Sequence, residues 1–116
     1  MDSFWTSGVR LVIGASGGPH ITTSVALTSL RHLYLGDNIK EAIDASRIHQ
    51  QLYPDQIIYE EYFPNNIVEE LNKRKNKIIM LDPEERGSIV MGISRDENGL
   101  LEANSDYRKG GTVDGE

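Results

Sequence analysis

The alternation of apolar and polar positions predicts that the chain opens with a strand, a turn and a helix. Residues 9–13 form a short apolar run rich in β-branched side chains, which favours a strand. Residues 14–18, Gly-Ala-Ser-Gly-Gly, follow, and these small residues permit positive φ angles and the close approach of another group. Pro19 suits the first turn of a helix, and apolar residues then recur at helical spacing from His20 to about Leu35.

A second helix follows, and after it the chain loses its regular pattern. Asn38 with Glu41 three residues later fits a capping box, which opens a helix that fades near Ser46. The inward positions of this helix are Ile39, Ala42 and Ile43. Residues 47–55 are polar and irregular, so we expect a loop there.

The second half predicts one further helix among short strands, which makes the whole chain α+β. Pro64, with Asn66 as a cap, opens a helix that runs through Leu71. Asn98-Gly99 is a hairpin signal between the last two strands. The predicted strands are residues 56–59, 88–94 and 100–103, and a short apolar run lies at 78–81. Residues 105–116 are polar and Gly-rich, which is typical of a surface tail.

Composition narrows the classes of function. The chain has 116 residues, which suffices for one domain at most, and a formal net charge of −6, which argues against a nucleic-acid surface and against attraction to an anionic membrane. The absence of cysteine excludes a disulfide scaffold, a thiol nucleophile and a Cys-ligated zinc site. No stretch approaches the roughly 20 apolar residues of a membrane span, and residues 1–5 lack the features of a signal peptide. The histidine spacing suggests no metal site, and we expect no cofactor.

The strand, glycine-rich turn and helix form the one local feature with chemical meaning, and its first interpretation is a nucleophile elbow. Residues 14–18 match G-x-S-x-G, with Ser16 as the nucleophile. The base would have to follow along the chain. His20 and His32 lie on the following helix, which leaves His49, and the fold that carries this elbow needs a far longer chain.

Three other interpretations of the turn stay open. Phosphate binding lacks support from the motifs, because no Lys-Ser or Lys-Thr follows the glycines and their spacing is wrong for G-x-G-x-x-G. An oxyanion hole is the next interpretation, because two successive glycine N–H groups at a helix start, those of Gly17 and Gly18, can point at one oxygen. A tight turn without chemistry is the remaining interpretation.

Three blocks of the sequence resemble the γ-glutamyltransferases, or glutathione hydrolases. They are VRLVIGASGGPHITT at residues 9–23, AIDASRIHQQL at 42–52 and SDYRKGG at 105–111. The blocks stand in the same order as in that family and cover most of the chain. The resemblance implies an N-terminal-nucleophile hydrolase with a four-layer αββα architecture, whose sheet is mostly antiparallel and packed by helices.

The resemblance also implies a reaction and its partners. In that family the N-terminal Thr of a small subunit attacks the γ-glutamyl amide of glutathione and passes the acyl group to water, an amino acid or a dipeptide. By position, Gly17 and Gly18 would bind the substrate carbonyl and supply the oxyanion hole. The expected partners are γ-glutamyl compounds and a large subunit. The expected location is the extracellular face of the plasma membrane or the extracellular space.

The sequence lacks the part of the family's small subunit that carries the nucleophile. The family nucleophile lies upstream of the glycine turn, so residues 1–116 correspond to one partial domain, the C-terminal portion of a small subunit. We therefore expect no turnover of glutathione by this chain alone, and an apolar sheet face where the N-terminal half of the small subunit would pack. The alternative is a non-catalytic, light-chain-like or truncated protein that acts as an interaction module.

Several polar residues outside the turn are expected to have structural roles. Arg47 and His49 should form structural hydrogen bonds, and the Arg108-Lys109 pair should support the sheet edge. The pairs at 60–61 and 84–85, all glutamate, are expected to be solvated. Thr22 and Thr23 follow the glycines, where capping or packing is favoured over lining a substrate pocket.

Overall fold

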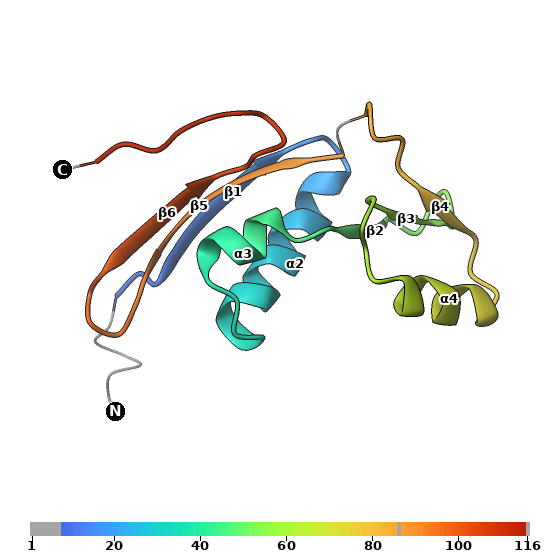
Figure 1. Cartoon of the computed structure of the whole chain (residues 1–116), viewed down its shortest axis with the longest axis horizontal. Helices are drawn as coiled ribbons and strands as arrows, with labels where there is room; N and C mark the ends of the chain where they lie inside the picture. The colour runs from blue at the N-terminus through green and yellow to red at the C-terminus, as the bar shows by residue number, and fades with distance from the viewer. Residues whose placement is uncertain (1–7, 86, 116) are drawn as a thin grey trace.

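A curved antiparallel sheet with two helices on one face forms the larger part of the molecule. The computed structural model describes residues 8–85 and 87–115. The sheet has the strand order β1-β5-β6. Its strands are β1 (Leu11–Ser16), β5 (Ile89–Arg95) and β6 (Leu101–Ser105), and the helices on its face are α2 (His20–Tyr34) and α3 (Ile39–Asp44) (Figure 1). The predicted α+β class, with helices packed on an antiparallel sheet, is confirmed.

The apolar core lies between α3 and the middle of this sheet. Ile39, Ile43 and Val90 are almost completely buried, and half-buried side chains of β1 pack against them. Gly92 lets the helix approach, because a Cβ at this position would lie 3.1 Å from Ile39 Cδ1. The capping box predicted for α3 is present, with the Asn38 side chain accepting from the Glu41 amide and the Glu41 side chain accepting from the Asn38 amide.

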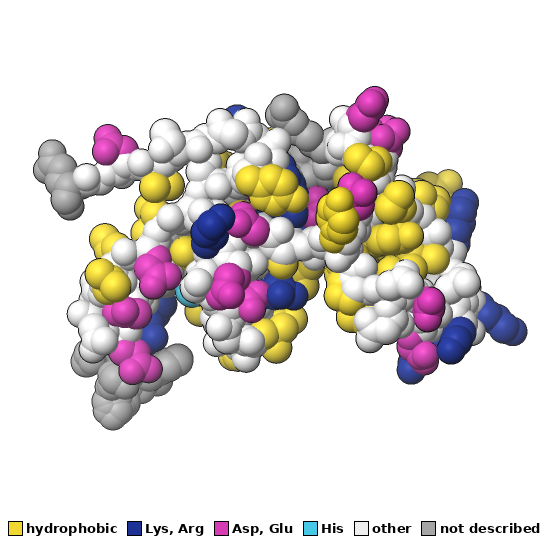
Figure 2. Space-filling model, viewed as in Figure 1, with side chains coloured by type: hydrophobic (Ala, Val, Ile, Leu, Met, Phe, Trp, Pro, Cys, Tyr) yellow, Lys and Arg dark blue, Asp and Glu magenta, His cyan; other side chains and the backbone are white. Residues whose placement is uncertain are grey.

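A second, smaller unit extends from the first. Its sheet has the order β2-β3-β4, with β2 antiparallel and β4 parallel to β3, and α4 connects the two parallel strands. The elements are β2 (Ile48–Gln50), β3 (Ile57–Tyr59), α4 (Asn65–Lys73) and β4 (Ile78–Met80) (Figure 1). No residue of α4 is fully buried, and apolar side chains gather on the surface around α4 and β4 in Figure 2.

The face of the larger sheet that lies opposite the helices is covered by no helix of the described residues, and the C-terminal segment runs back along this side (Figure 1). Cross-strand neighbours such as Val12 and Ile93 are 60% and 48% exposed. Other apolar side chains exposed in these strands are Met91, Leu101 and Ala103. The apolar sheet face expected from the sequence is therefore present. Among the described residues, no helix is long and apolar enough to cross a bilayer.

Several boundaries differ from those predicted. The first strand continues through Ser16, because residues 14–16 pair with residues 89–91 of β5. Residues 47–55 contain β2, which the local pattern hides because its partner β3 supplies the stabilising hydrogen bonds. Asn66 lies inside α4 and is not its cap; the N-cap position is Pro64. The last segment is a tail only in part, since Asp106 is fully buried and the side chain of Arg108 is 7% exposed.

Candidate active site

The glycine turn joins the last residue of β1 to the first residue of α2. Gly17 has a φ of 132° and Gly18 a φ of 60°, both in the region that favours glycine. Two hydrogen bonds close the turn: the amide of His20 donates to Gly17 O (3.2 Å) and the amide of Ile21 donates to Gly18 O (3.0 Å). The carbonyls of both glycines are therefore directed into the helix.

The two glycines are required for different reasons. A Cβ on Gly17 would lie 2.6 Å from the carbonyl oxygen of Gly87 and 2.8 Å from Cα of Ser88, so the turn packs directly on the backbone that leads into β5. A Cβ on Gly18 would meet no atom within 4 Å. Gly17 is thus required by both packing and conformation, whereas Gly18 is required by conformation alone.

The N–H groups of the turn are free of protein partners within residues 8–85 and 87–115. Neither Gly17 nor Gly18 donates a hydrogen bond to a described protein atom, and both residues are exposed. They lie at the N-terminal end of α2, where the helix dipole favours negative charge. Two adjacent donors in this position can stabilise an oxyanion if a substrate carbonyl reaches them.

The nucleophile-elbow interpretation finds no support in the contacts of Ser16. Ser16 is the last residue of β1, and no hydrogen bond among the described residues links it to a histidine. His49, the base that interpretation requires, bonds instead to Thr23 and Gln51. The described residues hold no group of three or more histidines and carboxylates that could bind a metal ion.

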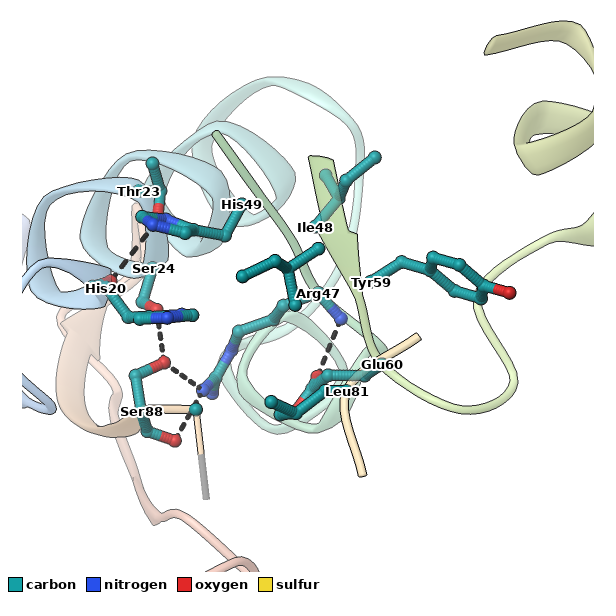
Figure 3. A pocket seen from close by; sticks show the side chains of 12 residues that line it. His20, Thr23, Ser24, Arg47, Ile48, His49, Tyr59, Glu60, Leu81 and Ser88 are labelled. Atoms are coloured by element: carbon teal, nitrogen blue, oxygen red, sulfur yellow. Dashed lines mark hydrogen bonds between the residues drawn. The ribbon is translucent and has the colours of Figure 1, made fainter. Parts of the chain in front are cut away.

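A pair of stacked histidines lies directly behind the turn. The rings of His20, at the start of α2, and His49, on β2, are 3.8 Å apart at their centroids and 20° from parallel (Figure 3). His49 Nδ1 lies 2.6 Å from the Thr23 hydroxyl, and His49 Nε2 lies 2.7 Å from Gln51 Oε1. Burial, with a smaller contribution from the neighbouring His49, lowers the pKa of His20.

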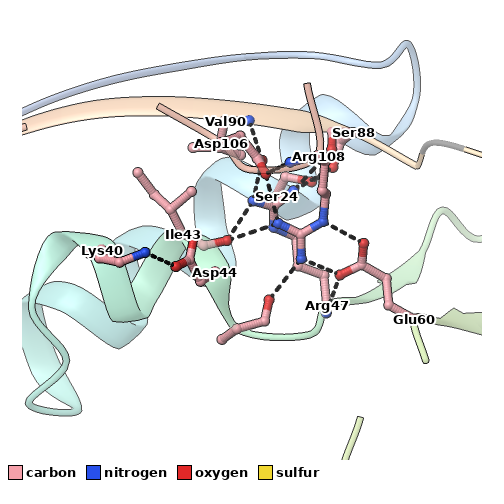
Figure 4. A network of polar contacts seen from close by, with 11 residues as sticks. Ser24, Lys40, Ile43, Asp44, Arg47, Glu60, Ser88, Val90, Asp106 and Arg108 are labelled. Carbon is pink, nitrogen blue, oxygen red and sulfur yellow. Dashed lines mark hydrogen bonds and ion pairs between the residues drawn. The ribbon is translucent and has the colours of Figure 1, made fainter. Parts of the chain in front are cut away.

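Four charged side chains form a buried network beside the histidine pair (Figure 4). Arg47 Nη2 lies 2.8 Å from Asp106 Oδ2, and Arg108 Nη1 lies 2.9 Å from Asp106 Oδ1. Arg108 Nη2 lies 2.6 Å from Glu60 Oε1. The side chain of Asp106 is 0% exposed and those of both arginines 6–7%, so two positive and two negative groups compensate one another away from water.

The network favours the ionised forms of Asp106 and Arg108. Burial alone would raise the pKa of Asp106, but hydrogen bonds from the backbone of Arg108, the side chain of Arg47 and the backbone of Val90 lower it overall. Burial would lower the pKa of Arg108, yet the hydrogen bond and charge of Glu60 raise it beyond its usual value. Asp106 therefore stays ionised in the folded protein at any physiological pH.

The network also reaches the backbone on which the glycine turn packs. Arg47 Nη1 donates to the carbonyl oxygen of Ser88 (3.1 Å) and to its hydroxyl (3.2 Å), and that hydroxyl also contacts the hydroxyl of Ser24. Ser24 lies on α2, and Ser88 precedes β5. Arg47 thus holds the backbone on which the turn packs, and the histidine pair lies in the same pocket against the first turn of α2.

Most of the structural roles predicted for polar residues are confirmed. Arg47 and His49 are buried and hydrogen-bonded. Of the Arg108-Lys109 pair, Arg108 binds Asp106 directly after β6, whereas Lys109 is exposed. Thr23 binds His49, so its packing role is confirmed, whereas Thr22 is exposed.

Two acidic residues differ from what the sequence predicts. The solvated position expected for Glu60 is wrong, because Glu60 binds Arg108; Glu61, Glu84 and Glu85 are exposed as expected. Asp106, which no sequence pattern singles out, is the centre of the network. The sequence does hold an Arg in the block at residues 42–52 and an Asp in the block at residues 105–111. Their presence does not by itself reveal that the two side chains pair.

Comparison with known proteins agrees with the fold. A family model described as Gamma-glutamyltranspeptidase matches residues 4–115. Over 107 residues the chain is 55% identical to scoloptoxin SSD20 of Scolopendra dehaani, and the match covers 92% of this chain and 53% of that protein. Over 105 residues it is 32% identical to a glutathione hydrolase proenzyme of Arthroderma benhamiae, and the match covers 88% of this chain and 18% of that protein.

A solved structure matches in three dimensions. A mutant of the Helicobacter pylori gamma-glutamyltranspeptidase superposes with a TM-score of 0.78 and 28% identity, covering 89% of this chain and 56% of that chain. The fold is thus an N-terminal-nucleophile hydrolase architecture with an antiparallel sheet and packed helices. The chain belongs to the gamma-glutamyltranspeptidase family. It spans about half the length, or less, of these three relatives.

Proposed function

We propose that this chain contributes the oxyanion hole of a glutathione hydrolase and γ-glutamyltransferase. The observation that carries the proposal is the pair of exposed amides at Gly17 and Gly18, neither of which donates to a described protein atom. Both lie at the start of α2, on a turn whose backbone is held by packing on Gly87 and Ser88. Family membership supplies the reaction that needs such a pair.

The chemistry is acyl transfer through an ester. A Thr hydroxyl adds to the γ-glutamyl carbonyl carbon, its proton passes to a base, and the carbonyl oxygen becomes an oxyanion. The N–H groups of Gly17 and Gly18 donate to that oxygen, on which negative charge develops in the transition state and is complete in the tetrahedral intermediate. Collapse then breaks the C–N bond, the amine leaves with a proton, and water or an amino acid releases the acyl group from Thr.

We further propose that residues 1–116 form one partial domain, the C-terminal portion of a small subunit. The remaining part of that subunit, which carries the Thr nucleophile, and a large subunit are the proposed partners. The helix-free face of the β1-β5-β6 sheet supports this, because exposed apolar side chains on adjacent strands are typical of a surface that another layer covers. The proposed location is the cell exterior, with no contact between this segment and the membrane or nucleic acid, and no metal or cofactor in the reaction.

The test removes one backbone N–H group of the turn. It uses the enzyme assembled from this chain and the partner that carries the Thr nucleophile. Semisynthesis that exchanges the Gly18 amide for an ester removes one N–H donor and adds no side chain, and it weakens the Gly17 carbonyl oxygen as an acceptor for the His20 amide. We expect kcat for a chromogenic γ-glutamyl anilide to fall by about 10²–10³-fold. An ester at Gly14, which lies within β1 and outside the turn, is the matched control. Equal kcat for the two esters would contradict the proposal.

A non-catalytic interaction module is the second candidate, and it is favoured by the 55% identity to a protein named as a toxin. The two candidates differ in one measurement. If the chain acts in catalysis, addition of the nucleophile-bearing partner restores release of the γ-glutamyl product. Under both candidates we expect residues 1–116 alone to release no product from glutathione above a Gly17→Pro control.

A further inference from the structure

The histidine pair has no part in the proposed acyl transfer, yet it lies against the residues that orient the turn. His20 is the first residue of α2, and its own amide closes the turn by donating to Gly17 O (3.2 Å). Any displacement of His20 therefore moves the backbone of Gly17 and Gly18. The ring of His20 stacks on the ring of His49, and its Nδ1 would lie 3.5 Å from a Cβ on Gly87.

His49 is itself held at both ring nitrogens. Gln51 donates through Nε2 to the carbonyl oxygen of Tyr53 (3.0 Å), so its Oε1 faces His49 and accepts from His49 Nε2 (2.7 Å). With the proton on Nε2, Nδ1 accepts from the Thr23 hydroxyl (2.6 Å), whose oxygen also lies 3.3 Å from the carbonyl oxygen of His20. The ring thus joins β2 to the first turn of α2 in one orientation and one tautomer.

We propose that His49 is a positioning residue for the glycine turn. Through the ring of His20 and the hydroxyl of Thr23 it fixes the first turn of α2, and with it the direction of the Gly17 and Gly18 amides. That His49 holds the turn in place is inferred from contacts in this chain, whether or not the turn acts in catalysis. The effect of His49 on catalysis rests on the proposed function.

The first test measures hydrogen exchange in the chain itself. The amides of His20 and Ile21, which close the turn, are compared with the amide of Leu35, which donates to Arg31 O at the opposite end of α2. In His49→Ala we expect exchange at His20 and Ile21 to accelerate at least about tenfold, with Leu35 unchanged. His49→Phe, which keeps the stacked ring, should retain most of the protection. Thr23→Val, which removes the hydroxyl and keeps the stacked histidine ring, should retain about as much protection as His49→Phe.

A matched control separates positioning from general destabilisation. His32 lies in the last turn of the same helix, where its Nδ1 contacts Asp37 O at 2.9 Å. His32→Asn should accelerate exchange at Leu35 and leave His20 and Ile21 as in the parent chain. If His49→Ala accelerates all three amides equally, or none of them, the proposal is overturned.

The second test measures kinetics in the assembled enzyme. His49→Ala should lower kcat about tenfold or more with KM unchanged, because the oxyanion forms after substrate binding. His49→Phe should recover most of the loss. If exchange at His20 and Ile21 rises and kcat does not change, His49 positions the turn and the turn has no catalytic function, which overturns the proposed function alone. A rise in KM with kcat unchanged would overturn a role for His49 in the reaction.

Discussion

The part of the molecule built on β1, β5 and β6 and the unit built on β2, β3, β4 and α4 differ in how deeply they bury their side chains. The first contains the cluster of Ile39, Ile43 and Val90, each at most 2% exposed. In the second, Ile57 is the buried apolar residue of the described segment, and α4 buries none. The first part therefore has its own core, whereas the second depends on what joins it to the first.

Charged groups form much of the junction between the two parts, beside the stacked rings of His20 and His49. Arg47 precedes β2 and Glu60 follows β3, and both reach Asp106 or Arg108 at the end of β6. A chain whose second unit has little apolar burial thus connects that unit through ion pairs and hydrogen bonds. Loss of the network should therefore affect the small unit and the large one together, while loss of an apolar contact should act locally.

The largest effect is expected from removal of Asp106. This carboxylate accepts from Arg47, Val90 and Arg108, so Asp106→Ala leaves two buried guanidinium groups without their shared partner. We expect the free energy of unfolding to fall by about 3–5 kcal/mol, measured by urea unfolding. Asp114→Ala, in the exposed tail, is the control and should change it by less than about 0.5 kcal/mol. A loss below about 1 kcal/mol for Asp106→Ala would disprove the role of the network.

The next effect compares the two parts directly. Ile43 is 0% exposed under the larger sheet, whereas Ile67 of α4 is 42% exposed. Ile43→Ala should cost about 2–5 kcal/mol, because it opens a cavity in the core. Ile67→Ala should lower the free energy of unfolding by less than about 1 kcal/mol, because the Ile67 side chain buries less apolar surface. Equal losses in urea unfolding would show that the small unit has a core comparable to that of the large one.

A smaller change in stability is expected when a glycine of β1 or of the turn is replaced by alanine, and its sign should differ between the two positions. Gly17→Ala should destabilise the chain by about 2 kcal/mol, from the positive φ and from the Cβ contact with Gly87 O at 2.6 Å. Gly14→Ala, where a Cβ meets no atom within 4 Å, should stabilise it by about 0.5 kcal/mol. Thermal unfolding of the two variants beside the parent chain measures both changes. Destabilisation of similar size at both positions would contradict the special geometry of the turn.

Local and long-range contacts differ in how far the sequence could predict them. Elements stabilised by neighbours along the chain were predictable: the capping box of α3 at Asn38 and the turn at Gly99 depend on residues three or four apart. β2 and the burial of Glu60 were not, because they depend on pairing with residues distant in sequence. For the site, the glycine pattern and the family resemblance identified the turn. The residues that support it, such as Asp106 and the stacked His20, carry no local signal of their role.

The smallest effect concerns the pH dependence of stability at the histidine pair. Burial lowers the pKa of His20 below its ordinary value of 6.5 in the folded protein. The unfolded chain therefore takes up a proton on His20 as the pH falls through 6.5, before the folded chain does. The stability that His20 contributes is complete above pH 6.5 and is lost as the pH falls toward its folded pKa.

Variants that cannot titrate at this position measure the effect. The groups that face His20 are His49, which opposes its protonation, Glu60, which favours it, and Arg47, which lines the same pocket. Between about pH 7.5 and 5.5 the melting temperature of the parent chain should fall more than that of His20→Phe, which keeps a stacked ring, or His20→Gln, which does not. Because the two variants differ in packing and share the loss of titration, they should have the same shallow slope. If the melting temperature of the parent chain changes with pH as little as that of the variants, His20 accepts its proton as readily in the folded chain as in the unfolded one. The pocket that holds the His20 ring would then not be desolvated.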